Sequence, residues 1–500
     1  MIDQLKLNPN PLVSYLEKLP QDFTKADILR YIEGNGIKMI NFRYAGGDGR
    51  LKVLNFVINN YAYLDQILTA GERVDGSSLF SFIEADSSDL YVVPRFNTAY
   101  HDPFAKIPTL GFLCAYFNKD GNPLESSPEY ILQKANRVFT QVTGGMEFYA
   151  MGELEYYVIG DEEDAFPAVD QRGYHEAAPF SKFEDFRCKA LMYISQVGGQ
   201  LKYGHNEVGN FVQNGKIYEQ NEIEFLPSPV TEAVDQLILG KWIINRLAYE
   251  YGLDITFAPK ITVGKAGSGM HVHTCIMKDG KNQYVANGQL SDTARKAIAG
   301  FMTLAPSLTA FGNTNPSSYF RLVPHQEAPT TVCWGDRNRS ALVRVPLGWS
   351  SDADMCARAN PNEKEESKDF SIKQTIEFRA PDGSANLYLL FAGLVTAACH
   401  GFEMDNALEV AANTYVDVNI HKAGNEKLTN HLEHLPSSCH ESADKLEEMK
   451  GIYTRHGVFS ERMINGLASQ LREFNDLNIR AEVAARPELM QELVDKYFYS

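Results

Sequence analysis

Four short segments far apart in the chain have strand-like sequences in which charged or polar residues, instead of aliphatic ones, occupy alternate positions. They are residues 151–156 (MGELEY), 218–225 (YEQNEIEF), 267–273 (GSGMHVH) and 375–379 (TIEFR). Side chains of a strand alternate between its two faces, so residues two apart point the same way. The pairs that share a face in this way are Glu153 with Glu155, His271 with His273, and Glu377 with Arg379. The pattern predicts a sheet with one charged face.

Carboxylates that converge in a cleft repel one another and lose their water, so a sheet that gathers them needs a cation. Carboxylate oxygens with one or two imidazoles are typical ligands of Mg²⁺ or Mn²⁺. Any one such strand, taken alone, is more often a solvated face or a polar rim. Four of them beside glycine-rich or arginine-rich sequence favour a shared metal cleft, although the separate solvated faces stay open at this point.

The bulk properties narrow the class of protein. A chain of 500 residues, 44% hydrophobic, is expected to contain more than one structural unit. The net charge of -17 argues against nucleic acid or an anionic membrane as partner. The N-terminus lacks an apolar secretory segment, and the most apolar stretch, 387–399, is too short to span a bilayer. Seven cysteines without a C-x-x-C pair favour reduced thiols, so we expect a cytoplasmic protein.

The chain is predicted to divide at a turn-rich segment, 118–123, into a domain of residues 1–122 and a domain of residues 123–500. Before the turn, 38–44 and 51–58 are strand-like. After it, the expected elements are helices at 129–142 and 229–251, amphipathic helices over about the last sixty positions, and a polar loop at 350–368.

Between Asp75 and Asp382, ten motifs in matching order resemble those of type I glutamine synthetase. They are VDGSS at 74–78, GELE at 152–155, HNEV at 205–208, QNE at 220–222, GSGMHVH at 267–273, SYFRL at 318–322, EAP at 327–329, RNRS at 337–340, VRVP at 343–346 and EFRAPD at 377–382. The resemblance implies an α+β fold: a small N-terminal β-grasp-like domain and a large catalytic domain with a curved antiparallel sheet flanked by helices. It also implies a homo-oligomer, commonly a dodecamer, with active sites at subunit interfaces.

The resemblance implies ATP-dependent ligation of ammonia to L-glutamate through γ-glutamyl phosphate, with ATP as co-substrate and two or more Mg²⁺ or Mn²⁺ ions per site. One metal would be bound by Glu155, Glu207 and Glu222, and the other by Glu153, His271 and Glu377. Implied substrate-binding residues are Ser78, Glu155, Tyr174, Gly267, His271, Arg321, Arg339 and Arg379, and implied ATP-binding residues are His273 and Arg344. Guanidinium groups suit this chemistry because they match planar oxyanions.

Implied catalytic residues are Asp75, Glu327, Arg339 and Arg344. Ammonium must lose a proton before it can attack. Asp75 resembles the family's carboxylate that accepts this proton and that reaches the active site from a neighbouring subunit. Glu327 resembles the carboxylate of a flap that closes over the acyl phosphate and excludes water. On local sequence alone, Asp75 equally fits a simple Asp-Gly turn.

Some positions depart from the family pattern. Ala266 replaces an asparagine beside the glutamate pocket, and Ser317 and Phe320 alter an Asn-Ser-Tyr-Lys-Arg-Leu run. Thr375 replaces a basic residue near the nucleotide, and Lys202 lies where an acid is common. The regulatory Asn-Leu-Tyr-Asp-Leu motif is absent, with 413–417 as its nearest echo, so control by adenylylation is not expected.

Three alternatives stay open. A γ-glutamyl amine or polyamine ligase would use the same scaffold with an organic amine as nucleophile, and the altered loop at Ala266 favours it. A non-catalytic oligomeric relative would have lost the metals, whereas all six proposed ligands are present. A metal-dependent hydrolase would use the acids but would leave the arginines unexplained.

Overall fold

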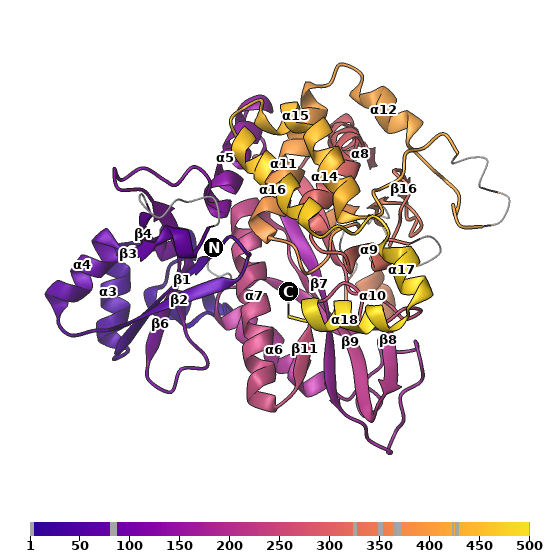
Figure 1. The fold of residues 1–500 in the computed structure, drawn as a ribbon. Coiled ribbons are helices and arrows are strands. Elements are labelled where there is room, and N and C mark those ends of the chain that lie inside the picture. Colours follow the sequence, from indigo (N-terminus) through magenta and orange to yellow (C-terminus); the bar gives the residue numbers. More distant parts are fainter. Residues whose placement is uncertain are drawn as a thin grey trace.

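The computed structural model describes residues 5–80, 88–323, 328–348, 354–364, 366, 373–422, 425 and 430–499. The first part of the chain forms a small domain around a six-stranded sheet, which lies to one side of the large domain (Figure 1). Its strands are β1 (Met39–Ala45), β2 (Leu51–Val57), β3 (Glu72–Asp75), β4 (Asp89–Pro94), β5 (Tyr100–His101) and β6 (Thr109–Phe117), in the order β2-β1-β6-β4-β3 with β5 beside β6. The helices α2 (Pro11–Leu16), α3 (Lys25–Gly34) and α4 (Tyr61–Ala70) complete it. β1 runs parallel to β6 and antiparallel to β2.

The large domain is built on a ten-stranded sheet. Its main path is β16 (Trp334–Asp336), β17 (Val343–Val345), β18 (Ile376–Phe378), β12 (Met270–Lys278), β7 (Glu147–Asp161), β9 (Lys216–Phe225) and β8 (Leu201–Gln213). The short strands β10 (Ser228–Pro229) and β11 (Asp254–Thr256) pair with β7, β13 (Lys281–Asn282) pairs with β12, and β14 (Val285–Ala286) and β15 (Gln289–Leu290) form a separate hairpin. Except for the parallel pair β16 and β17, the pairs in this sheet are antiparallel. The α+β fold expected from the resemblance is confirmed.

One face of the large sheet packs on helices and holds the main core. The helices of the large domain are α5 (Pro128–Val142), α6 (Glu184–Gln196), α7 (Val230–Tyr251), α8 (Asp292–Gly312), α9 (Ser318–Arg321), α11 (Leu387–Glu403) and α12 (Ala407–Asn413). Fully buried Leu154, Ile223 and Val272 belong to the same core as Leu237 of α7 and Leu390 of α11. The opposite face of β7, β9 and β12 therefore faces away from this core.

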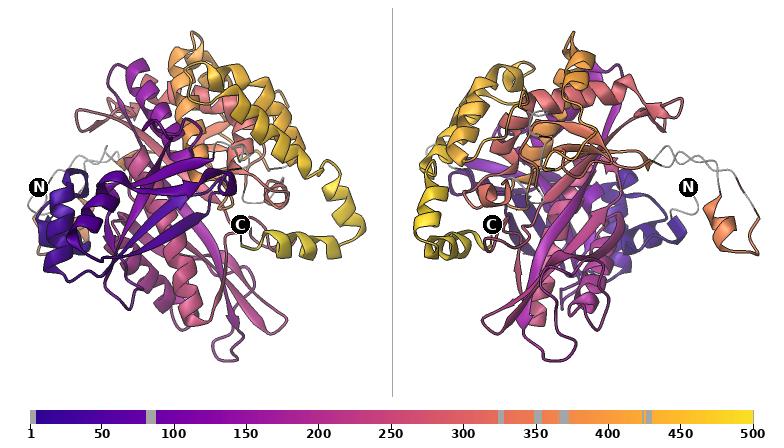
Figure 2. Two further views of the ribbon diagram at one scale, coloured as in Figure 1. Left: turned by 60° about the vertical axis from the view of Figure 1, so that its left-hand side comes forward. Right: turned by 90° about the vertical axis from the view of Figure 1, so that its right-hand side faces the viewer.

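The C-terminal region is helical, as the sequence predicts. It contains α14 (Cys439–Glu448), α15 (Lys450–Thr454), α16 (Glu461–Glu473), α17 (Ile479–Ala485) and α18 (Glu488–Tyr497), which wrap one side of the large domain (Figure 2). Val483 of α17 and Met490 of α18 pack with Tyr157 of β7 and Phe320 of α9. The last helices thus cover the far end of the polar sheet face.

Two expectations on local structure need correction. The predicted polar loop 350–368 contains a short helix, α10 (Met355–Ala359), whose first turn is capped by the Asp354 side chain. Residues 267–269 of the GSGMHVH segment precede the strand, since β12 begins at Met270.

Among the described residues no single helix is long and apolar enough to cross a membrane, and α11 and α12 pass a length and composition test only as a pair bent by 111°.

A buried ion pair joins the two domains. Arg95, directly after β4, donates two hydrogen bonds of 2.8 Å to Asp235 of α7, and the Tyr388 hydroxyl of α11 donates to the same carboxylate at 2.7 Å. Side-chain exposure is 16% for Arg95 and 8% for Asp235. α7 lies between the small domain and the large sheet (Figure 1), so this contact holds the small domain against the sheet that carries the polar face.

We expect Arg95→Ala to lower the free energy of unfolding by about 3–5 kcal/mol, because it leaves the Asp235 carboxylate buried without its partner. The matched control is Arg73→Ala, since Arg73 pairs with Asp89 at 3.4 Å with both side chains 64% exposed. The control should change stability by less than about 1 kcal/mol. Denaturant unfolding of the three proteins measures both effects, and an equal loss in both variants would contradict the assignment.

Candidate active site

The strand register gathers the predicted acidic side chains on one face of the large sheet. Glu153 of β7 lies opposite His271 of β12 on one side and Glu224 of β9 on the other. Glu155 lies opposite Glu222 in the same pairing. Directly opposed residues in an antiparallel pair point to the same face, so these side chains form one continuous surface.

The register extends the polar surface toward the edge of the sheet. Glu377 of β18 lies between His273 of β12 and Arg344 of β17. The intervening residues point into the core, and Gly152 sits where a Cβ would approach Leu237 of α7 to 2.8 Å. Close packing of α7 on the apolar side therefore fixes which face of β7 carries its acids.

Glu153 lies at the centre of this face and contacts both histidines of β12. Its carboxylate oxygens lie 2.9 Å from Nδ1 of His271 and 2.8 Å from Nε2 of His273. Burial alone would raise the pKa of Glu153, but the charges and hydrogen bonds of the two histidines hold this pKa well below its ordinary value. Burial opposes protonation of His273, yet the neighbouring Glu153 raises the pKa of this imidazole.

Glu377 is the point where the acids meet the arginines. Its carboxylate lies 2.9 Å from Nη1 of Arg344 and 3.1 Å from Nε of Arg379, and it is 3.6 Å from Nδ1 of His271. Burial and the Glu153 charge raise the pKa of Glu377, but His273, Arg379 and His271 outweigh them and lower it. Glu377 is therefore an ionised carboxylate that positions cationic side chains at the edge of the cleft.

Glu222 shows the opposite electrostatic balance. Burial raises its pKa well above the ordinary carboxyl value, and repulsion from Glu153, Glu155 and other nearby acids raises it further. Its carboxylate lies 3.2 Å from Nε2 of His205, and burial lowers the pKa of that imidazole. This corner of the face has more negative charge than its own side chains neutralise.

Glu155 and Glu207 complete the first predicted metal set. Glu155 accepts hydrogen bonds from the backbone amide of Gly269 at 2.5 Å and from Nε2 of Gln220 at 3.3 Å. Glu207 lies where the pairing of β8 with β9 is interrupted, between Asn206 and Asn210, and accepts from the amide of Val208. Its carboxylate contributes to the electrostatic repulsion at Glu222. The structure thus brings the three predicted side chains to one corner.

Arg321 of α9 lies next to the histidine end of the face. It is buried and donates to the carbonyls of Ala380 and Arg379, with its Nη2 atom 3.4 Å from Nε2 of His271. A Cβ on Gly267 would meet the carbonyl of Pro259 at 2.5 Å and Cγ of Arg321 at 3.1 Å. A side chain at Gly267 would therefore displace this arginine.

Asp75 lies on the small domain and has a different environment. It ends β3, is exposed, and accepts hydrogen bonds from the hydroxyls of Ser77 and Ser78 at 2.7 Å each. The Ser78 and Ser77 hydrogen bonds lower the pKa of Asp75 to about 2. Among the contacts given for the described residues, none joins Asp75 to the acidic face of its own chain.

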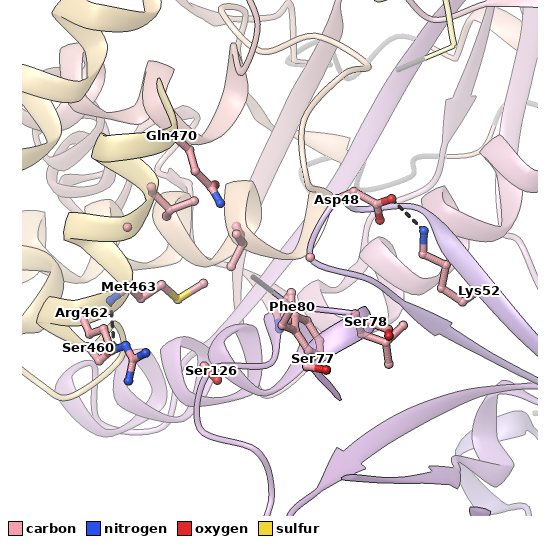
Figure 3. A pocket seen from close by; sticks show the side chains of 16 residues that line it. Asp48, Lys52, Ser77, Ser78, Phe80, Ser126, Ser460, Arg462, Met463 and Gln470 are labelled. Carbon is pink, nitrogen blue, oxygen red and sulfur yellow. Dashed lines mark hydrogen bonds and ion pairs between the residues drawn. The ribbon is translucent and has the colours of Figure 1, made fainter. Parts of the chain in front are cut away.

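The turn after Asp75 borders a cavity of about 670 Å³ (Figure 3). Its lining includes Ser77, Ser78 and Lys52 of the small domain and Arg462 and Gln470 of α16. None of its lining residues belongs to the acidic face. We assign the chemistry to the acidic face, because the charged groups converge there.

Of three further predicted site residues, the structure describes two, Tyr174 and Arg339. Tyr174 is 49% exposed and stacks on His175, and its ring centroid lies 5.7 Å from that of His205 in a T-shaped arrangement. Arg339 is exposed, and its carbonyl accepts a hydrogen bond from Arg379. Glu327 lies outside the described residues.

Several residues at the face were missed as candidate site residues. Glu224 accepts hydrogen bonds of 2.5 Å from Lys202 and from the Tyr203 hydroxyl. Its position two residues after Glu222 on a strand was the signal that could have identified it. Thr375, noted in the sequence only as a departure, contacts Nδ1 of His273 at 2.8 Å.

The donor set fits divalent cations that prefer oxygen ligands. This face has two groups of potential metal ligands, and within each group the ligand atoms lie within 4.8 Å of one another. One group is Glu153, His273 and Glu377, and the other is His205, Glu222 and Glu224. Their donors are four carboxylates and two imidazoles, a set that suits Mg²⁺ or Mn²⁺. The uncompensated repulsion at Glu222 is an independent reason for a cation there.

We expect Glu222→Gln to change stability with opposite signs in the two metal states. In EDTA the variant should melt at the same temperature as the wild type or above it, because a neutral side chain removes the repulsion. At a Mg²⁺ concentration about 100 times Kd, the wild type should gain about 2.7 kcal/mol and melt about 3 °C higher. The variant should gain less than half of this shift. Thermal melts of both proteins in EDTA and in Mg²⁺ measure these melting temperatures. An equal rise in melting temperature with Mg²⁺ in the wild type and the variant would exclude Glu222 as a ligand.

Comparisons with known proteins agree with this arrangement. Residues 36–119 match the family model described as glutamine synthetase, beta-Grasp domain, and residues 125–483 match the model described as glutamine synthetase, catalytic domain. Glutamine synthetase of Aquifex aeolicus is 29% identical over 484 residues, covering 91% of this chain and 96% of the relative. A protein named 3-hydroxylaminophenol mutase, from Cupriavidus pinatubonensis, is 28% identical over 475 residues, 88% of this chain and 93% of the relative.

Solved structures give the same fold. Plasmodium falciparum glutamine synthetase superposes with a TM-score of 0.75 at 19% identity, covering 93% of this chain and 98% of the other. A structure titled as a complex of GmaS with ADP superposes with a TM-score of 0.70 at 20% identity, covering 92% of this chain and 96% of the other. With both family models matched in order along most of its length, this chain belongs to the glutamine synthetase family.

Proposed function

We propose that this protein is a glutamate–ammonia ligase that forms L-glutamine, ADP and phosphate from L-glutamate, ammonia and ATP. Membership of the family supports a ligase that uses ATP and divalent metal ions. The observation that carries the phosphoryl-transfer part of the proposal is the meeting of the acidic face with Arg344 and Arg379 at Glu377, because phosphoryl transfer needs metal sites and guanidinium groups side by side. The ionised Asp75 carboxylate favours ammonium over an organic amine as the nucleophile. We further propose residues 1–122 and 123–500 as the two domains.

The proposed reaction begins with phosphorylation of the substrate. A γ-carboxylate oxygen of glutamate forms a bond to the terminal phosphorus of ATP while the bond to ADP breaks. Divalent cations on the acidic face would neutralise the phosphate charge and orient the in-line oxygens. Arg339 and Arg344 are proposed to bind the moving phosphoryl group, Arg321 the substrate α-carboxylate, and Arg379 the reacting end, because guanidinium groups donate paired hydrogen bonds to planar oxyanions.

The second half of the proposed reaction needs a base for ammonium. Asp75 is proposed to bind ammonium and accept its proton, and the resulting ammonia attacks the acyl carbon while phosphate leaves. The low pKa of Asp75 keeps its carboxylate ionised at neutral pH, which suits binding of a cation. Because no contact among the described residues joins Asp75 to the acidic face of its own chain, we propose that it serves the site of a neighbouring subunit in a homo-oligomer. Glu327 is proposed to close this site.

A γ-glutamyl amine ligase is the second candidate. The loop at Ala266 favours it, because a small side chain there leaves the edge of the substrate pocket different from the family pattern. Ala266 is held by its backbone, which accepts from the Tyr157 hydroxyl and donates to the side chain of Gln171. The relatives named GmaS and 3-hydroxylaminophenol mutase indicate that the fold is used by proteins with names other than glutamine synthetase.

The deciding experiment is phosphate release from ATP with glutamate and Mg²⁺, measured with ammonium and with a panel of mono-, di- and polyamines. We expect ammonium to give the highest kcat/KM and glutamine to accumulate in equal amount with phosphate. Release with a diamine but not with ammonium would establish the second candidate. No nucleophile-dependent release with any amine would overturn both.

A further inference from the structure

A second group of potential metal ligands lies away from the acidic face, where α11 meets the turn after α15. Cys399 and Glu403 are four residues apart on α11, so they lie on the same side of that helix. His456 follows α15. One ligand atom from each of the three side chains lies within 4.8 Å of the others. None of the three belongs to the proposed catalytic site.

The contacts of Glu403 already draw the two elements together. Its Oε1 atom lies 2.8 Å from Nε2 of His456, and its Oε2 atom lies 3.3 Å from Nη1 of Arg455. The carboxylate is therefore oriented with one oxygen toward the imidazole and the other toward the guanidinium. An ion pair alone explains these two contacts, but it does not explain the thiol beside them.

The environment of Cys399 is that of a thiol held near a carboxylate. It is 3% exposed, and none of the hydrogen bonds given for the described residues involves its Sγ atom. Burial, followed by the Glu403 charge, raises the pKa of Cys399 to about 12. A metal ion can bind this side chain as a thiolate, and binding then releases the thiol proton.

A fourth residue beside the cluster has an unsatisfied nitrogen. His400 lines a small cavity together with Cys399, Glu403 and His456. The Nδ1 atom of His400 is buried and has no hydrogen-bond partner. A water molecule on a bound cation can donate a hydrogen bond to this nitrogen, and buried polar atoms without partners are uncommon in folded proteins.

We propose that Cys399, Glu403 and His456 bind a divalent cation that accepts sulfur and nitrogen ligands, Zn²⁺ in the first place, at a site distinct from the acidic face. A thiolate ligand disfavours Mg²⁺ and favours Zn²⁺. In a tetrahedral zinc site the nitrogen and oxygen ligands lie about 3.3 Å apart, so the Glu403–His456 pair needs only a small outward movement. Water takes the fourth position.

The bound ion would have a structural consequence. α11 packs against α5 and α8 in the core, while His456 belongs to the C-terminal helical region. A cation shared by α11 and the turn after α15 fastens this region to the core. Zinc should therefore stabilise the protein even when Mg²⁺ saturates the acidic face.

The test is Zn²⁺ binding by the full-length protein in saturating Mg²⁺, measured by calorimetry and by metal analysis after gel filtration. We expect one Zn²⁺ per chain for the wild type and at least a tenfold weaker affinity for Cys399→Ser and for His456→Ala. Cys188→Ser is the matched control, because Cys188 is an exposed cysteine outside the cluster, and it should bind like the wild type. Equal Zn²⁺ binding by the wild type and Cys399→Ser, or no binding by the wild type, would overturn the proposal.

Cobalt substitution gives a second readout that does not depend on folding stability. Co²⁺ bound to a thiolate has a sulfur-to-metal charge-transfer band, so the wild type and His456→Ala at high Co²⁺ should show the band while Cys399→Ser should not. His456 is partly exposed, so its replacement should leave the fold intact. A cobalt band that persists in Cys399→Ser would assign the thiolate to another cysteine and refute the site.

Discussion

Glu153→Gln is expected to lower kcat/KM for the proposed glutamine-forming reaction by about 10³-fold, equivalent to about 4 kcal/mol of transition-state stabilisation. The introduced glutamine side chain has nearly the same shape as the Glu153 side chain, but it lacks the negative charge at the centre of the face. Both His271 and His273 lose the carboxylate that orients them. Steady-state kinetics with saturating ATP and glutamate measures the loss, and calorimetric Mg²⁺ binding should weaken in parallel.

The matched control is Glu147→Gln. Glu147 lies on the same strand at an even offset in sequence from Glu153, so its side chain points to the same face, but it is exposed at the beginning of β7. Its replacement should leave kcat/KM within about twofold of the wild type, because a solvated surface charge contributes little. A loss in Glu147→Gln as large as in Glu153→Gln would show that the effect comes from damage to β7 and not from the acidic face.

The two acids should also differ in their effect on the metal-free protein. Glu153 is stabilised as an anion by histidines, whereas Glu222 is destabilised by other acids. In EDTA, Glu153→Gln is therefore expected to lower the melting temperature, while Glu222→Gln should not. The contrast separates the loss of an ion pair from the relief of repulsion on a single sheet face.

Strand periodicity was sufficient to predict the acidic face because alternation is a property of the backbone itself. Glu153, Glu155, His271 and Glu377 are related by two-residue steps and by pairing of their strands, and the register places them together. The helix predicted at 229–251 corresponds to α7, Val230–Tyr251, because its apolar residues and the terminal Gly252 are local signals.

What could not be predicted depends on contacts between distant segments. Periodicity along one strand does not predict the contact of Thr375 with His273 or the ion pair of Lys202 with Glu224. Both contacts depend on which strands pair with each other. Phe320, noted as a departure from the family motif, packs with Val483 of α17, an element that local sequence predicts but does not position. The cluster of Cys399 with His456 could not be predicted either, because it forms between two segments that are distant in the sequence.

Asp75→Asn is expected to lower ammonium-dependent turnover by about 10²–10³-fold while leaving Mg²⁺ binding unchanged. Asparagine retains an oxygen that can accept from Ser77, so the turn should keep its shape. It cannot accept the ammonium proton, and it removes the charge that attracts the cation. Measuring glutamine formation against ammonium concentration separates a rise in KM from a fall in kcat, and we expect both.

The control for Asp75→Asn is Asp89→Asn, since Asp89 lies directly opposite Asp75 in the β3–β4 pair and is likewise exposed. It should retain turnover within about twofold, because its salt bridge with Arg73 is solvated. Unchanged turnover in Asp75→Asn would remove Asp75 from the reaction and would favour an organic amine that needs no ammonium pocket.

Mixing the two inactive variants tests whether Asp75 acts on the neighbouring subunit. In an oligomer assembled at random from equal amounts of Asp75→Asn and Glu153→Gln chains, half of the acidic faces are intact, and half of these have a neighbour with an intact Asp75. Activity should then return to about one quarter of the wild-type value if each site is shared between adjacent subunits of a symmetric ring. If Asp75 served the acidic face of its own chain, every site would carry one defect and no activity would return. Since Asp75 is exposed and, among the described residues, makes no contact with that face, recovery near one quarter is the expected result.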